Sequence, residues 1–157
     1  MKNSDLFKNG YLFKNLREDE LSKVIDIAIL RRFESGDIIF QENNEANAIY
    51  IVVNGRVALS QNVHDSDIEF TRINPGSHFG EMAFIDGALR SATARCTERS
   101  ELFEVRYDAL NSVLAADLHI ATKLYCAFSH FLVGRLRNTT HDLTFAKEMN
   151  TREATEF

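Results

Sequence analysis

The run of short strand-like segments between Arg31 and Arg106 is the feature that most constrains the fold of this chain. Segments rich in branched and aromatic residues alternate there with turns that contain Gly, Pro, Asn or Asp. The predicted strands cover residues 31–33, 37–40, 48–53, 56–61, 68–73, 92–97 and 101–106. Short strands at this spacing favour a β-barrel or jelly roll.

Two kinds of turn separate these predicted strands. Asn54-Gly55 lies between strands 48–53 and 56–61, and Asn-Gly is the strongest short signal for a two-residue hairpin. We therefore expect these two strands to pair with each other. A second polar turn is predicted over 62–67, and Pro75-Gly76 predicts a turn at the end of strand 68–73.

Helical patterns flank the predicted barrel. Asn15 can cap a helix, with Glu18 three residues later, and apolar residues at helical spacing continue to near Leu30. We accordingly predict a helical lead-in over 1–30, the barrel over 31–106, C-terminal helices over 107–147 and a flexible tail over 148–157.

A long helix is predicted from about Asp117 to near Ala146, and its apolar residues exceed one stripe. The first face is formed by Leu124, Phe128 and Phe131. The second comprises Leu132, Leu136, Thr139 and Leu143, which step by four, three and four as in a coiled-coil seam. We expect one face to pack on the barrel and the other to form a homodimer; a single broad core stripe is the alternative.

The stretch from Pro75 to Cys96 carries the chemistry of the chain. After its Pro-Gly turn, Gly80 begins a segment of about one helical turn, which Gly87 ends. The first N–H groups of a helix can hold an anion. Arg90 adds a planar charged fork suited to phosphate oxygens, and Glu81 is an acceptor suited to sugar hydroxyls. A sugar phosphate is the ligand that this combination predicts.

Two segments of this stretch resemble the phosphate-binding cassette of cyclic nucleotide-binding domains: Phe79-Gly80-Glu81-Met82-Ala83 and Arg90-Ser91-Ala92-Thr93. The resemblance implies a jelly-roll β-barrel (a double-stranded β-helix) with helices on either side and a cassette over 79–92. It also implies that Glu81 binds the ribose 2′-hydroxyl and Arg90 the cyclic phosphate. The implied ligand-binding residues in the cassette are Phe79, Gly80, Glu81, Met82, Ala83, Arg90, Ser91 and Ala92. The alternative is a surface salt bridge between Glu81 and Arg90.

A second, shorter resemblance lies on the long helix. Arg135-Leu136-Arg137-Asn138-Thr139-Thr140 is similar to the segment of bacterial catabolite-activator proteins whose hydroxyl pair touches adenine from both subunits. This implies that Thr139 and Thr140 contact the base; two solvated residues are the alternative. In the family, the position of Ser91 is often Thr in cGMP sites and Ala in cAMP sites, while Ser occurs in bacterial cAMP receptors. We therefore expect cAMP as the ligand, with cGMP second.

Charge and composition limit the classes of binding partner that we expect for this chain. A net charge of −5 argues against a general nucleic-acid binder. Catabolite-activator proteins continue into a helix-turn-helix domain. If this sequence is the whole protein, direct DNA binding is not expected; if it is a fragment, the effector lies in the rest of the protein. We see no apolar run of membrane-spanning length, no signal peptide in Met1–Phe13, and no motif at Cys96 or Cys126. These observations predict a cytoplasmic protein whose output is an effector protein, a change of oligomeric state or ligand buffering.

Two other classes of function compete with this prediction. A cupin-type metal enzyme would need a His-x-His pair, whereas His78 precedes Glu81 alone, and no nucleophile–base arrangement is visible. A ligand-free interaction module would not need Glu81, Arg90 and Ser91 together. The sequence thus predicts a sensor domain without catalysis or cofactor, which couples binding of a cyclic nucleotide to helix rearrangement or partner binding.

Overall fold

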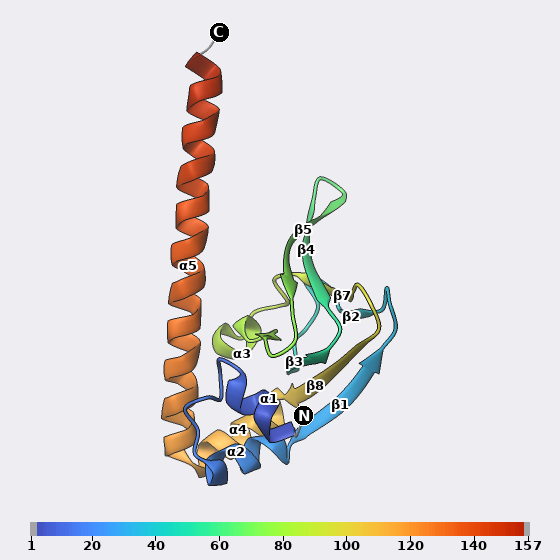
Figure 1. Ribbon diagram of the computed structural model, residues 1–157, viewed down its shortest axis with the longest axis vertical. Coiled ribbons are helices and arrows are strands. Elements are labelled where there is room, and N and C mark those ends of the chain that lie inside the picture. Colours follow the sequence, from blue (N-terminus) through green and yellow to red (C-terminus); the bar gives the residue numbers. More distant parts are fainter. Residues whose placement is uncertain (1–2, 156–157) are drawn as a thin grey trace.

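The computed structural model describes residues 3–155, so residues 1–2 and the last two residues of the predicted tail, 156–157, lie outside it. Figure 1 shows a barrel of strands, a group of short helices at its base and one long helix that runs past the barrel. The short helices at the base are α1 (Asn3–Asn9), α2 (Glu18–Ile25) and α4 (Tyr107–Ala116).

The barrel consists of two four-stranded antiparallel sheets. The first has the order β1 (Ala28–Phe33), β8 (Ser100–Arg106), β3 (Ala48–Asn54) and β6 (His78–Phe79). The second has the order β2 (Ile38–Phe40), β7 (Thr93–Cys96), β4 (Val57–Val63) and β5 (Ser66–Ile73). Buried apolar side chains from both sheets form the barrel core, among them Tyr50, Val52, Leu59 and Ala94. The predicted jelly-roll barrel with flanking helices is confirmed.

The prediction that Asn54-Gly55 forms a hairpin is wrong. β3 pairs with β8 and β6, whereas β4 pairs with β5 and β7, so this turn carries the chain from one sheet to the other. Gly55 has a φ of +84°, and an added Cβ would lie 2.6 Å from the carbonyl oxygen of Arg99. The glycine is therefore required by this close approach as well as by its backbone conformation.

β4 and β5 form the hairpin, which projects from the barrel in the same direction as the long helix (Figure 1). Its turn places His64 and Asp65 at φ values of +49° and +61°. Two successive positive φ values match a type I′ turn, whose twist suits a two-residue hairpin. The polar turn predicted over 62–67 is thus the one that folds the hairpin.

The N-terminal helix begins and ends at other residues than we predicted. Arg17, not Asn15, is the N-cap of α2, and the Glu20 carboxylate accepts a hydrogen bond from its backbone N–H at 2.8 Å. The helix ends at Ile25 rather than near Leu30, because residues 28–30 pair with β8. Residues 28–30 therefore form a strand although their apolar spacing fits a helix.

The long helix α5 (Leu118–Thr155) has 38 residues, and its first half packs on the protein. Leu124 and Phe128 are buried in one core cluster with the N-terminal helices, as predicted for that face. Lys123 Nζ lies 2.6 Å from the Glu20 carboxylate and fastens α5 to α2. The helix runs past its predicted end near Ala146, and the flexibility predicted from 148 onward stays a prediction.

His78 lies at the contact between β6 and α5. The imidazole is 5% exposed, and its ring centroid lies 4.3 Å from that of Phe131. Burial, followed by the nearby charge of Arg135, lowers the pKa of His78 to about 3. The folded protein therefore holds this histidine in its neutral form, while unfolding restores its ordinary affinity for a proton.

This predicts a loss of stability in mild acid. Below the unfolded pKa of 6.5, the unfolded chain binds a proton that folded His78 does not, so stability falls as pH decreases. The loss approaches about 1.4 kcal/mol per pH unit. His78→Gln should remove this part of the slope in thermal unfolding between about pH 7.5 and about pH 5.5. The control His130→Gln, at an exposed position of α5, should keep the wild-type slope; equal slopes for all three proteins would contradict the prediction.

Candidate functional site

The predicted cassette folds as a tight turn, a short strand and a short helix. The turn is closed by a hydrogen bond from Ser77 N to Asn74 O at 3.1 Å, and β6 follows it. Helix α3 (Met82–Asp86) begins after Glu81 and ends at Gly87, which has a φ of +69°. The helix start expected at Gly80 and the break expected at Gly87 are thus found to within two residues.

Gly80 lets the cassette close around Arg90. Its φ is +87°, and an added Cβ would lie 2.8 Å from Arg90 Nη1 and 3.1 Å from the carbonyl oxygen of Ala48. A side chain at this position would therefore be strained by the backbone and would also displace the guanidinium. The glycine of the cassette is fixed by the need to seat a buried arginine beside it.

Arg90 is 3% exposed and anchored on several sides. Its Nη2 donates to Ala48 O at 2.8 Å, and its Nη1 contacts Gly80 O and the Tyr107 hydroxyl, each at 3.2 Å. The guanidinium carbon lies 3.9 Å from the ring centroid of Phe40. Burial lowers the pKa of Arg90 below its usual value, although such a group stays charged at neutral pH.

One nitrogen of this buried guanidinium has no protein partner. Arg90 Nε makes no hydrogen bond within the described residues 3–155, although the atom is inaccessible to solvent. A buried donor without an acceptor costs free energy, and in a native protein it calls for a ligand, a water or a strained role. The site therefore retains donor capacity for an anion.

Glu81 is 1% exposed and pairs with a residue that lies far away in sequence. Its Oε1 lies 3.4 Å from Nη1 of Arg135 on α5. The alternative of a surface salt bridge with Arg90 is therefore not what the structure shows. Burial raises the pKa of Glu81, and the charge of Arg135 offsets only part of that effect. The long helix thus supplies the counter-charge for a buried carboxylate of the cassette.

All eight predicted cassette residues line one pocket of about 410 Å³, a volume that includes solvent at its mouth. Thr139 and Thr140 do not line it; both are exposed on α5. In one chain, therefore, the structure does not bring the two threonines to the cassette.

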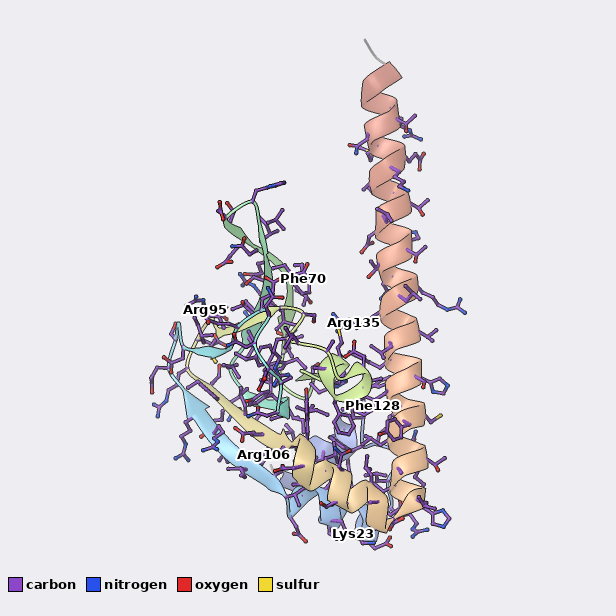
Figure 2. All side chains as sticks on the ribbon, turned by 180° about the vertical axis from the view of Figure 1, so that it is seen from behind. Lys23, Phe70, Arg95, Arg106, Phe128 and Arg135 are labelled. Atoms are coloured by element: carbon purple, nitrogen blue, oxygen red, sulfur yellow. The ribbon has the colours of Figure 1, made fainter. Side chains whose placement is uncertain are left out.

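Sequence reasoning missed four residues that complete the lining: Phe40, Leu59, Phe70 and Arg135. Figure 2 shows Phe70 on the projecting hairpin and Arg135 on α5. Phe70 is the extra residue of a bulge, because Leu59 pairs with Thr71 and Ser60 with Glu69. Arg135 is the first residue of the segment that resembles the catabolite-activator helix. That position was the signal in the sequence that could have identified it as a pocket residue.

The pocket combines a buried cation, a buried carboxylate and apolar walls. Arg90 and Arg135 provide donors for anionic oxygens, and Glu81 can accept hydrogen bonds from hydroxyl groups. Phe40, Phe70 and Leu59 provide surface for a flat apolar group. Within residues 3–155, no group of three or more His, Cys, Asp or Glu side chains is placed to hold a metal ion. The same residues include no helix long and apolar enough to cross a membrane.

The cyclic nucleotide-binding domain family matches residues 30–117 of this chain. Human cGMP-dependent protein kinase 2 is 36% identical over 83 residues, which are 52% of this chain and 11% of the kinase. The match thus spans about a tenth of that relative's length.

Solved structures share the fold. The regulatory domain of Toxoplasma gondii PKA, solved with cAMP, is 25% identical with a TM-score of 0.67, over 70% of this chain and 42% of that one. The catabolite activator protein of Thermus thermophilus has a TM-score of 0.77 at 23% identity, over 88% of this chain and 63% of that one.

The raised pKa of Glu81 predicts that its ionised carboxylate lowers the stability of the folded protein. Because its pKa is raised from 4.5, the folded state disfavours the ionised carboxylate, and stability falls as pH rises above about 4.5. Glu81→Gln should therefore unfold at a higher temperature than wild type at neutral pH, with a margin that shrinks on acidification. Glu98→Gln, in an exposed turn, should match wild type. A Glu81→Gln protein that melts below wild type at every pH would mean that the pair with Arg135 outweighs desolvation.

Proposed function

Because this chain belongs to the cyclic nucleotide-binding domain family, we propose that it is a sensor domain whose pocket binds cAMP, with cGMP as the second candidate. The family is a regulatory ligand-binding domain rather than a catalytic one. The observation that carries the proposal is the buried Arg90 with an unpartnered Nε, in the same pocket as the buried Glu81.

The proposed contacts follow from the hydrogen-bond donors and acceptors that line the pocket. The cyclic phosphate carries one negative charge, and the unpartnered Arg90 Nε–H, together with the second N–H of Nη2, is left to donate to its oxygens. Glu81 accepts a hydrogen bond from the ribose 2′-hydroxyl. Backbone N–H groups of Met82, Ala83 and Ala92 and the hydroxyl of Ser91 complete the phosphate contacts. These roles are those that the cassette resemblance implies, and the shared pocket supports them.

The base is proposed to lie toward the mouth of the pocket, between β5 and α5. Phe70, which is 48% exposed, and Leu59 offer apolar surface there, with Arg135 across from them. Ser91 favours cAMP by the family pattern, whereas the similarity to a cGMP-dependent kinase favours cGMP. Thr139 and Thr140 remain proposed base contacts, and they require a second subunit because neither lines the pocket of its own chain.

A route for coupling the ligand to the helices runs through Phe84 of α3. Its ring centroid lies 5.1 Å from that of Tyr107 on α4 and 5.9 Å from that of Phe128 on α5. A displacement of α3 would therefore change its contacts with both C-terminal helices, α4 and α5. Such a switch requires the ligand to bind the two arrangements with different affinities. We propose that the output is a partner protein or a change in oligomeric state, in the cytoplasm.

The free face of α5 supports a homodimer. Leu136 and Leu143 are 67% and 55% exposed, and they belong to the seam predicted from their spacing. Val133, Phe145 and Met149 add to the apolar surface of the same helix. A second copy of α5 would cover these side chains in a coiled coil, and it would also bring a partner's helix near each pocket.

Titration calorimetry with cAMP and cGMP tests the binding proposal. Truncating one partner of a buried charge pair costs about 2–5 kcal/mol, so Arg90→Ala should bind roughly thirtyfold to several thousandfold more weakly. Arg90→Lys should recover part of this loss, because lysine lacks the planar fork. Glu81→Gln should cost less than Arg90→Ala, since it alters a sugar contact.

The control for these variants is Arg95→Lys, at an exposed position of β7 outside the pocket (Figure 2). Circular dichroism must accompany Arg90→Ala, because Arg90 also satisfies the carbonyl groups of Ala48 and Gly80. An Arg90→Ala protein that binds within about threefold of wild type would reject the assignment of the cassette. Wild-type protein that binds neither nucleotide would favour the ligand-free interaction module.

Leu136→Glu tests the homodimer. A carboxylate in an apolar seam is costly, so this variant should be monomeric by light scattering while its circular dichroism stays that of wild type. Asn138→Glu, exposed on the same helix but outside the seam, should remain dimeric. The proposal fails if wild-type protein is monomeric at high concentration both with and without nucleotide.

A further inference from the structure

Tyr107 touches three parts of the protein that meet at the phosphate site. It is the first residue of α4, and its backbone N–H donates to Asn47 O at 2.8 Å. Its hydroxyl donates to Gly80 O at 2.5 Å and accepts from Arg90 Nη1 at 3.2 Å. Its ring packs on Phe84 of the cassette helix. One residue therefore connects the barrel, the cassette and α4.

The hydroxyl of Tyr107 restricts the guanidinium of Arg90. Arginine has five N–H donors, of which Nη1 uses two, toward Gly80 and Tyr107, and Nη2 uses one, toward Ala48. The Nε–H and one N–H of Nη2 are left. Without the phenol, Nη1 would lose one of its two acceptors, and the guanidinium could turn about its last side-chain bonds. Burial raises the pKa of Tyr107, so the phenol keeps the proton that it donates to Gly80.

We propose that Tyr107 is a positioning residue for the phosphate site, whose hydroxyl orients Arg90 before the anion arrives and ties that orientation to the first turn of α4. This inference rests on the proposed function, in which Arg90 binds the phosphate. A donor that is already oriented loses less freedom on binding, so pre-orientation raises affinity. Because the same residue begins α4, a displaced α4 would carry the phenol away from Arg90.

The phenol is separable from the packing of the ring. Tyr107→Phe keeps the ring on Phe84 and removes only the hydroxyl. It should weaken cAMP binding roughly three- to tenfold, the range for losing one orienting hydrogen bond. Tyr125→Phe is the matched control, since its ring also lies against Phe84, at 6.4 Å, but it comes from α5 and does not line the pocket. The control should bind cAMP as wild type does.

A double-mutant cycle distinguishes positioning from a general loss of structure. In an Arg90→Lys background, the planar guanidinium is absent, so adding Tyr107→Phe should change affinity by less than about twofold. A purely structural role would weaken binding equally in both backgrounds. Equal effects in the two backgrounds, or no effect in wild type, would overturn the inference.

A measurement without nucleotide separates this inference from the proposed function. The Arg90 Nε–H signal in a ¹⁵N NMR spectrum, assigned by its loss in Arg90→Lys, reports the mobility of the guanidinium. Tyr107→Phe should lower its heteronuclear NOE, and Tyr125→Phe should not. If wild type binds no cyclic nucleotide but this NOE falls, the proposed function fails while the positioning of Arg90 by Tyr107 stands. An unchanged NOE in Tyr107→Phe would overturn the inference whether or not nucleotide binds.

Discussion

The arrangement of the site depends on the burial of one guanidinium, that of Arg90. A charge taken out of water is tolerated only when protein groups replace its hydration, and here two backbone carbonyls, a phenol and an aromatic face do so. Each of these groups comes from a different segment, so the strands and the first turn of α4 must all be in place before Arg90 can be seated. Gly80 is the most constrained of them, because no other residue leaves room for Nη1.

The helix α5 takes part in the core, in the pocket and in the exposed seam, and these roles divide along its length. Near its start, Leu124 and Phe128 are buried, and Lys123 pairs with Glu20. About two turns beyond Phe128, Arg135 reaches the buried carboxylate of Glu81. Farther on, the described side chains are exposed. A helix anchored at one end and charged at its middle is suited to respond to a change in the pocket, whereas a helix packed along its whole length is not.

Local chemistry was predictable from the sequence, and long-range pairing was not. The cassette could be predicted because Gly80, Glu81 and Arg90 lie within eleven residues, and turns such as Pro75-Gly76 depend on their own residue types. The Asn54-Gly55 hairpin was wrong because the pairing of β3 with β8, far away in sequence, determines which sheet each strand joins. Phe70 and Arg135 were missed for the same reason, since only the folded barrel brings β5 and α5 to the cassette.

Glu81 and Arg135 together give the proposed switch a physical basis. Without hydroxyl donors, the buried carboxylate depends on a cation that α5 supplies, and its raised pKa records that this compensation is incomplete. A sugar hydroxyl donating to Glu81 would satisfy the same carboxylate from inside the pocket. The position of α5 and the occupancy of the pocket would then both change the free energy of the Glu81 carboxylate. Because the ligand and the helix stabilise the same buried charge, binding of one is coupled to the position of the other. Arg90 and Tyr107 repeat this arrangement at α4, so both C-terminal helices meet the cassette through a buried ionisable side chain rather than through apolar contacts alone.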